Sequence, residues 1–325
     1  MRLRPLGECG LRVSEIALGT MNFGSDWLGI GALDEGRARR LVDIALDAGV
    51  NLFDTADVYG LGASESMLGK VLGKRRKKVL VSTKTLYPMD PRDPRSGGLS
   101  RRRILRAAEE SLRRLKTDWL DLYMPHAPDP GVPPEESLEA FAALVKAGKV
   151  RALGCSNFPA RELERWLGLS RSLKAPRLEF AQAEYSLAAR SIERDLVPVC
   201  RSRRVGLLAW SPLAGGFLSG KYRAGRPRPA GARRSFAGAG FPPLPEARLE
   251  GLAAVLERIA AVERRTPAQT ALAWLLGRPC LAAAVVGART PEQLREDLAA
   301  AGRPLAPASG AFLDRAAAAT ERAAA

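Results

Sequence analysis

The sequence predicts a protein of the α/β class built as a single (β/α)8 TIM barrel. Between residue 15 and about residue 300, short apolar runs alternate with amphipathic stretches of helical period. Successive right-handed crossovers bring the eighth strand beside the first, so eight such units close a barrel, whereas an open doubly wound sheet is the second possibility. The strand-like runs are EIALGT (15–20), NLFDT (51–55), KVLVSTK (78–84), WLDLYM (119–124), VRALGCS (150–156), FAQAEY (180–185), VGLLAW (205–210) and AAAVVGA (282–288).

Helical patterns lie between these runs and carry capping signals at their ends. Glycine suits the position after the last turn of a helix, and serine or threonine suits the position before the first. The C-terminal glycines are Gly49, Gly148 and Gly302, and the N-terminal caps are Ser64, Ser100 and Thr266. The helical stretches cover 33–50, 64–74, 99–115, 133–149, 159–170, 191–204, 246–265, 266–278 and 291–302.

Three segments extend the minimal barrel, although the whole chain, 1–325, is expected to form one domain. Residues 1–14 predict a small N-terminal β-hairpin that closes the barrel bottom. The Gly-, Pro- and Arg-rich segment 214–245 predicts a long loop after the seventh strand, and loops of this length are usually functional, here for cofactor or substrate. Residues 309–325 predict a C-terminal helix with a frayed tail.

The composition is that of a globular protein that needs neither a membrane nor a metal. Hydrophobic residues make up 46% of the chain and charged residues 26%. No apolar run approaches the roughly 18 residues of a membrane span, so we expect no membrane partner and a cytoplasmic location. The four cysteines lie far apart without CxxC spacing, which predicts neither a zinc site nor disulfides. His126 is the single histidine, which excludes multi-histidine metal sites.

The net charge of +16 raises the possibility of a nucleic-acid partner. The basic residues are mostly arginines scattered along the chain, however, and the two dense runs, 74–78 and 101–103, contain no aromatic residues for base stacking. We interpret both runs as solvated surface and expect no nucleic-acid binding. A positive field also favours an anionic dinucleotide.

Polar and aromatic residues end most of the predicted strands. In this architecture the catalytic groups come from the C-terminal ends of strands, which meet at one mouth of the barrel. Each residue alone has an ordinary explanation as a cap, a surface ion-pair partner or a structural histidine, but together they predict a site. They are Asp54, Lys84, His126, Ser156, Asn157, Gln182, Trp210, Ser211, Gly287 and Arg289.

Four of the rim residues suit the chemistry of carbonyl reduction. The reaction delivers a hydride to carbon while an acid protonates the oxygen, and Tyr59 lies in the loop after Asp54. A phenol has a pKa of about 10, which the ammonium of Lys84 is expected to lower, while Asp54 holds that ammonium in place. His126 is expected to donate a hydrogen bond to the carbonyl oxygen. The catalytic residues predicted are therefore Asp54, Tyr59, Lys84 and His126.

These residues lie within motifs that resemble the aldo-keto reductase family, in particular its bacterial branch similar to the β subunits of potassium channels. The resemblance covers nearly the whole chain and implies that the four catalytic residues match the family's tetrad. The motifs are FDTADVYG (53–60) with SE (64–65), STK (82–84), SLRRLKTDWLDLY (111–123) followed by His126, GCSNF (154–158), QAEYSL (182–187), AWSPLAGGFLSGKY (209–222) and GARTPEQL (287–294).

The resemblance implies an NADP(H) cofactor held across the later strands. It assigns the nicotinamide amide to Ser156, Asn157 and Gln182, ring stacking to Trp210, the pyrophosphate to the loop 211–221 with Lys221, and the 2′-phosphate to Arg289. The fork of Arg289 favours NADPH over NADH. The predicted cofactor residues are Thr20, Met21, Asp54, Ser156, Asn157, Gln182, Trp210, Ser211, Pro212, Leu213, Gly215, Lys221, Gly287, Arg289, Gln293, Glu296 and Asp297.

Two departures from the family's pattern lie near this cofactor site. Glu296-Asp297 replaces the usual Glu-Asn near the adenine, which keeps an acceptor and loses an amide donor. Val286 replaces a commonly found proline. Neither departure involves the tetrad.

The expected activity is the NADPH-dependent reduction of a neutral aldehyde or ketone. The predicted substrate pocket is formed by Trp27, Tyr59, Tyr87 and His126, with Met21 and the loop 214–245 as further walls. The alternative from another class is a redox-sensing regulatory subunit that binds NADP(H) with little turnover. The sequence leaves the identity of the carbonyl compound open, and it allows either a monomer or a homo-oligomer.

Overall fold

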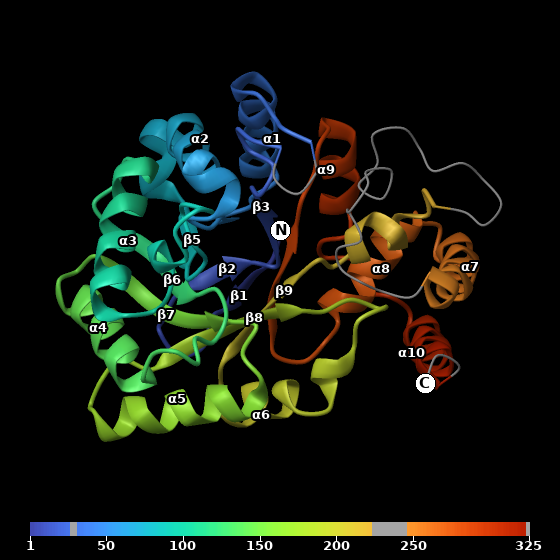
Figure 1. Cartoon of the computed structure of the whole chain (residues 1–325). Coiled ribbons are helices and arrows are strands. Elements are labelled where there is room, and N and C mark those ends of the chain that lie inside the picture. Colours follow the sequence, from blue (N-terminus) through green and yellow to red (C-terminus); the bar gives the residue numbers. More distant parts are fainter. Residues whose placement is uncertain (27–30, 223–245, 323–325) are drawn as a thin grey trace.

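A computed structural model describes residues 1–26, 31–222 and 246–322. Eight parallel strands form a closed barrel in the order β10-β3-β4-β5-β6-β7-β8-β9, and helices form a ring around it (Figure 1). The (β/α)8 prediction is therefore confirmed. The barrel strands are β3 (Ile16–Gly19), β4 (Leu52–Asp54), β5 (Leu80–Thr85), β6 (Leu120–Pro125), β7 (Val150–Ser156), β8 (Leu178–Glu184), β9 (Gly206–Trp210) and β10 (Leu281–Val286).

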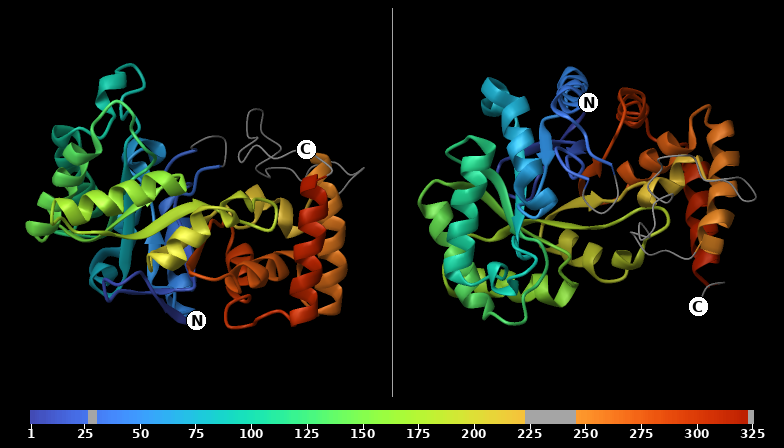
Figure 2. Two further views of the ribbon diagram at one scale, coloured as in Figure 1. Left: turned by 90° about the horizontal axis from the view of Figure 1, so that it is seen from below. Right: turned by 45° about the horizontal axis from the view of Figure 1, so that its top comes forward.

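The α-helices follow the strands in the order that the amphipathic pattern predicts. Two of them, α7 and α8, separate β9 from β10, and the C-terminal helix α10 packs along α7 (Figure 2). The helices are α1 (Glu35–Asp47), α2 (Ala63–Leu72), α3 (Arg101–Leu115), α4 (Pro134–Lys146), α5 (Ala160–Ser172), α6 (Leu196–Ser202), α7 (Glu246–Val262), α8 (Pro267–Leu276), α9 (Pro291–Leu298) and α10 (Pro307–Arg322). No helix among the described residues is long and apolar enough to cross a membrane.

Capping at the helix N-termini agrees with the sequence in two of the three predicted cases. Ser100 accepts a hydrogen bond from the Arg103 backbone, and Thr266 forms a capping box at the start of α8. The prediction of Ser64 as an N-cap is wrong, because α2 begins at Ala63 and its N-cap is Gly62, with φ 92°. The buried hydroxyl of Ser64 instead donates to the Thr20 carbonyl at 2.7 Å. Ser64 therefore ties α2 to the loop after β3.

The predicted N-terminal hairpin is formed by β1 (Leu3–Pro5) and β2 (Arg12–Ser14), which pair antiparallel. Leu6 and Val13 of this hairpin are fully buried and join the apolar cluster that fills the barrel interior. A Cβ atom on Gly206, at the start of β9, would come within 3.0 Å of Leu6 Cδ1. The hairpin therefore packs against the N-terminal ends of the strands, opposite the mouth.

The interpretation of the two basic runs as solvated surface is wrong for Arg76 and Arg103, which are buried. Arg76 pairs with Asp121 at 2.7 Å and lies over the Trp119 ring, and Arg103 pairs with Asp57 at 3.1 Å. Buried carboxylates need a charged partner, and these arginines provide it. The sequence pattern alone does not reveal which arginine of a run points inward.

Three predicted features lie wholly or partly outside the described residues. Trp27 lies there, as do residues 223–245 of the long loop and the last residues, 323–325. The described start of the loop forms a short 3-10 helix, η6 (Ala214–Ser219).

Tight packing inside the barrel gives a test of its core. A Cβ atom on Gly154 of β7 would overlap the fully buried ring of Phe180 on the adjacent strand β8. We expect Gly154→Ala to lower the free energy of unfolding by about 1–3 kcal/mol, as overpacked cores do, measured by urea unfolding. Phe180→Leu should relieve part of that loss in the double variant, because the two side chains share one space.

The matched control is Gly168→Ala in α5, where a Cβ atom meets nothing within 4 Å. Alanine is the better helix former, so this variant should be as stable as the parent or more stable. Strictly additive effects of Gly154→Ala and Phe180→Leu would contradict the packing described for this layer.

Candidate functional site

A cavity of about 1050 Å³ opens at the C-terminal ends of the barrel strands. Its lining includes all the predicted cofactor residues and three of the predicted catalytic residues, and Lys84 lies behind Asp54. The predicted residues that line the cavity are Thr20, Met21, Asp54, Tyr59, Tyr87, His126, Ser156, Asn157, Gln182, Trp210, Ser211, Pro212, Leu213, Gly215, Lys221, Gly287, Arg289, Gln293, Glu296 and Asp297.

The deepest charged pair of the site joins Lys84 to Asp54. Lys84 on β5 is fully buried, and its Nζ donates to Asp54 Oδ1 at 2.6 Å and to the Thr55 carbonyl at 2.8 Å. Burial alone would lower the pKa of Lys84, but the charge of Asp54 and contact with Tyr59 raise it above its ordinary value. Lys84 is therefore a fixed ammonium at neutral pH.

Tyr59 lies against this ammonium at the start of η2 (Tyr59–Gly62), with Lys84 Nζ 5.2 Å from its ring centre. Burial raises the pKa of Tyr59, Lys84 lowers it and Asp54 raises it, and the net direction is upward. The expectation of a lowered pKa is thus wrong, because the loss of water outweighs the effect of Lys84. The phenol keeps its proton, as a proton donor must.

His126 follows β6 and lies between two tyrosines at the mouth. Its ring meets those of Tyr59 and Tyr87 edge to face, with centroids 5.7 Å and 5.0 Å away. Burial and, after it, the charge of Lys84 hold the pKa of His126 well below its ordinary value, so the imidazole is neutral. Its buried Nδ1 has no hydrogen-bond partner in the described part of the chain. A neutral imidazole can donate one hydrogen bond to a ligand oxygen.

The amide side chains at the mouth are engaged within the protein in ways that the sequence does not indicate. Gln182 Nε2 donates to Asp54 Oδ2 at 2.8 Å, which fixes the second oxygen of that carboxylate. Asn157, with φ 58°, donates from Nδ2 to the His126 carbonyl and accepts at Oδ1 from Trp210 Nε1 at 3.0 Å. The first bond links the ends of β8 and β4, and the bonds of Asn157 link the ends of β6, β7 and β9.

The other end of the cavity carries charged groups. Arg289 and Lys221 lie there with the N-terminus of α9, whose cap Thr290 accepts a hydrogen bond from the Gln293 backbone. An anion is favoured at such a helix end. In η6, Gly216 has φ 91°, and a Cβ atom there would come within 2.6 Å of Lys221 Nζ, so only glycine leaves this approach open.

Asp297 on α9 is an acid with an unusual environment. Its side chain is buried and lines the cavity. Burial and, after it, the charge of Glu296 raise the pKa of Asp297 to about 8, although Lys221 acts in the opposite direction. Most of the molecules therefore carry a protonated Asp297 at pH 7. A protonated carboxyl group can donate a hydrogen bond, as the amide of an asparagine can.

Several lining residues are missing from the sequence-based prediction. Five of them are apolar residues of the loops after β4 and β5, and the three prolines of residues 86–98 were the signal that could have indicated the second loop. Asn22 was also missed, and its side chain ties the loop after β3 to the Ala288 carbonyl at 3.0 Å. The missed residues include Asn22, Val58, Leu61, Pro88, Pro91, Pro94 and Ala268.

The groups along the cavity fit a nicotinamide dinucleotide. Uncharged amides and the aromatic Trp210 at the catalytic end suit a planar carboxamide ring, and the cations with the helix N-terminus at the other end suit phosphates. Among the described residues, no group of three or more His, Cys, Asp or Glu side chains could hold a metal ion.

Comparisons with known proteins agree with this geometry. A model of the Aldo/keto reductase family matches residues 15–317. An uncharacterized oxidoreductase of Bacillus subtilis (strain 168), YrpG, is 39% identical over 91% of this chain and 89% of its own length. A putative voltage-gated potassium channel subunit beta of Schizosaccharomyces pombe is 35% identical over 91% of this chain and 87% of its own length. The family's members are oxidoreductases that use nicotinamide cofactors, and this chain belongs to the aldo/keto reductase family.

Proposed function

We propose that the protein reduces an aldehyde or ketone to the alcohol with NADPH, with Tyr59 as the general acid. The observation that carries the proposal is the convergence of the tetrad at one mouth. Lys84 Nζ lies 2.6 Å from Asp54 and 5.2 Å from the Tyr59 ring centre, and His126 lies beside Tyr59. These contacts supply a proton donor, a cation to stabilise the resulting phenolate and an anchor for that cation.

The residues divide the work of the reaction between them. NADPH, when bound, supplies the hydride that reduces the carbonyl carbon. The carbonyl oxygen lies between Tyr59 and His126, and the neutral imidazole of His126 orients it. Tyr59 gives its proton to that oxygen as negative charge develops there, and Lys84 stabilises the phenolate left behind. The proton of Tyr59 is restored from solvent, so one carbonyl, one hydride from NADPH and one proton would yield one alcohol and NADP⁺.

The proposed cofactor contacts follow the polarity of the cavity. Ser156, Asn157 and Gln182 would bond the carboxamide, and Trp210 would stack on the ring. At the far end Arg289 would pair with the 2′-phosphate. The planar fork of its guanidinium group suits a phosphate, and for this reason we propose NADPH over NADH. Running the same assay with NADH measures this preference.

The substrate end of the cavity is apolar and aromatic. Val58, Leu61, Tyr87, Pro88 and Pro91 line it, and the ionisable side chains Lys221, Arg289, Glu296 and Asp297 lie at the cofactor end. Uncharged walls leave an ionic group of a ligand without a partner. We therefore propose a neutral organic carbonyl as the substrate.

A second candidate is a redox-sensing subunit that binds NADP(H) with little turnover. It is favoured by the similarity to the putative voltage-gated potassium channel subunit beta of Schizosaccharomyces pombe, whose name describes a channel subunit and not an enzyme. The two candidates share the cofactor site and differ in turnover. Steady NADPH oxidation with any member of a panel of aldehydes and ketones supports the enzyme, whereas tight binding without oxidation over the whole panel supports the sensor.

Replacing Asp297 tests the adenine end of the cofactor site. We propose that the protonated acid of Asp297 supplies the donor to the adenine that an asparagine amide supplies in the family. NADPH affinity of the parent should then fall as the pH rises through about 8, because the ionised form loses its donor and repels the phosphates. Asp297→Asn stays uncharged and should bind with nearly pH-independent affinity.

The affinity is measured by the fluorescence of bound NADPH over a pH series for both proteins. Titration of the cofactor itself is common to the two series and cancels in their ratio. Glu296, Lys221 and Arg289 also face this end, and both proteins keep them. Parallel pH curves would show that Asp297 has no role in the pH dependence.

Tyr59→Phe tests the general acid directly, because it removes the hydroxyl and keeps the ring. Turnover of a reactive aldehyde, followed by NADPH absorbance, should fall by about 10²–10⁴, the usual contribution of a positioned acid. NADPH binding should persist, since its proposed contacts come from other residues. Turnover within about tenfold of the parent would reject Tyr59 as the acid.

A further inference from the structure

The turn that carries Tyr59 is held in a strained conformation. Gly60, Leu61 and Gly62 have φ values of 57°, 52° and 92°, and Leu61 is not a glycine. A leucine in the left-handed region is sterically unfavourable and persists only where the surrounding structure fixes it. Something outside the turn must therefore hold it.

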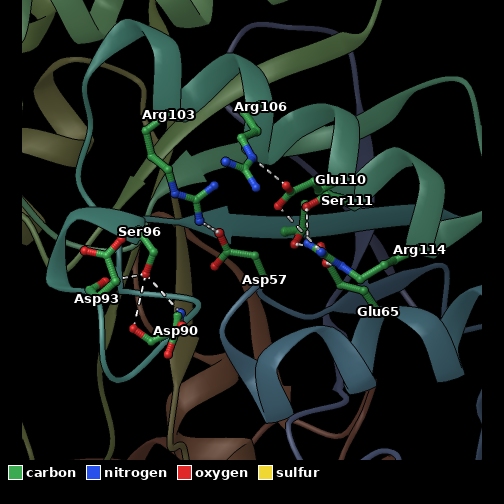
Figure 3. A network of polar contacts seen from close by, with 11 residues as sticks. Asp57, Glu65, Asp90, Asp93, Ser96, Arg103, Arg106, Glu110, Ser111 and Arg114 are labelled. Carbon is green, nitrogen blue, oxygen red and sulfur yellow. Dashed lines mark hydrogen bonds and ion pairs between the residues drawn. The ribbon is translucent and has the colours of Figure 1, made fainter.

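Two buried ion pairs flank this turn, one on each side. Before it, Asp57 Oδ2 lies 3.1 Å from Arg103 Nη2, and after it, Glu65 Oε2 lies 2.6 Å from Arg114 Nε. The two carboxylates are fully buried, and the arginines are 9% and 17% exposed. Figure 3 shows both arginines reaching from the same helix, α3. They lie about three helical turns apart, so one rigid helix braces both ends of the turn.

The same residues attach the turn to the strand of the catalytic lysine. The backbone N–H of Asp57 donates to the Lys84 carbonyl at 3.1 Å, and Thr83 Oγ1 donates to Glu65 Oε1 at 2.6 Å. A Cβ atom on Gly62 would come within 2.7 Å of Arg114 Cδ, so the turn lies directly on this arginine. The turn is thus held between β5 and α3.

Stability does not explain the pair of Asp57 and Arg103. Burial and, after it, the charge of Glu65 raise the pKa of Asp57 to about 7 in spite of Arg103, so ionising Asp57 is unfavourable in the folded protein. Asp57 Oδ1 and Arg103 Nε are buried without hydrogen-bond partners in the described chain. Buried ion pairs of this kind are often no better for stability than apolar residues.

We infer that Asp57 and Arg103 are positioning residues, whose ion pair holds the strained turn so that the phenol of Tyr59 stays against Lys84. The inference rests on the proposed role of Tyr59 as the acid. Neither residue lines the cavity, so neither touches substrate or cofactor. Misplacement of a reacting group by about 1 Å can cost about a hundredfold in rate.

The chain offers a matched control at the opposite end of the barrel. Arg76 and Asp121 form a second buried arginine–aspartate pair, 2.7 Å apart and 5% and 1% exposed. Arg76 donates to the Val79 and Trp119 carbonyls, which lie just before β5 and β6. Breaking this pair should cost stability without moving Tyr59.

The test compares Arg103→Met with Arg76→Met, using a reactive aldehyde and NADPH. We expect Arg103→Met to lower kcat by about tenfold or more, with the dissociation constant of NADPH unchanged within about twofold. Arg103→Lys should recover part of kcat, because an ammonium can still pair with Asp57. Arg76→Met should lower the melting temperature but keep kcat within about twofold of the parent. Should Arg103→Met not fold, Asp57→Asn replaces it, with a fall in kcat expected again.

Two results for the arginine and aspartate variants would overturn the inference, and a third would come from Tyr59→Phe. One is a kcat within about twofold of the parent in Arg103→Met or Asp57→Asn, and another is an equal loss of kcat in Arg76→Met. Tyr59→Phe is assayed alongside. Loss of turnover there with normal turnover in Arg103→Met rejects the positioning role alone. Normal turnover in Tyr59→Phe rejects the proposed function and the positioning role with it.

Discussion

The ion pair of Lys84 and Asp54 is the interaction on which the rest of the site depends. A fully buried ammonium is unfavourable unless a carboxylate and further acceptors surround it. Here Asp54 and the Thr55 carbonyl accept from Lys84, and Gln182 fixes the other oxygen of Asp54. The parallel pairing of β4 with β5 supplies this geometry, because both strands end at the same mouth.

Burial then sets the protonation of the neighbours of Lys84, and the charge of Lys84 modifies it. This charge lowers the pKa of His126, which burial already lowers, and it opposes the rise that burial causes in the pKa of Tyr59. The resting site therefore holds a neutral imidazole and a protonated phenol beside a permanent cation. This is the state that a proton donor to a carbonyl oxygen requires before the reaction.

The fold could be predicted from the sequence because its signals are local and periodic. Alternating strands and amphipathic helices fix the barrel topology, and the rule that strand ends meet at one mouth places Asp54, Lys84 and His126 together. The resemblance to the family also assigns the cofactor contacts, which the residues alone do not reveal. The sequence predicted that the hairpin closes the barrel bottom. In the structure it also contributes Leu6 and Val13 to the barrel interior.

What the sequence missed depends on burial and on long-range partners. The direction of the Tyr59 pKa shift follows from desolvation, and the raised pKa of Asp297 follows from its burial and from the charge of Glu296. Arg103 belongs to a basic run that the sequence pattern places on the surface. Its side chain points inward to Asp57, which lies 46 residues away in the sequence. Ser64 is not the N-cap of α2, because the strained turn ends at Gly62 and the helix begins at Ala63. None of these can be derived from a local pattern.

The most direct measurement of the central claim is the rate of hydride transfer in a single turnover of Lys84→Met. The variant is loaded with NADPH, mixed with a reactive aldehyde and followed by NADPH absorbance, with the exposed Lys70→Met as control. We expect that NADPH still binds and that the transfer slows by about 10²–10⁴, since Tyr59 loses the cation that stabilises its phenolate. Transfer at the rate of the parent would contradict the central claim.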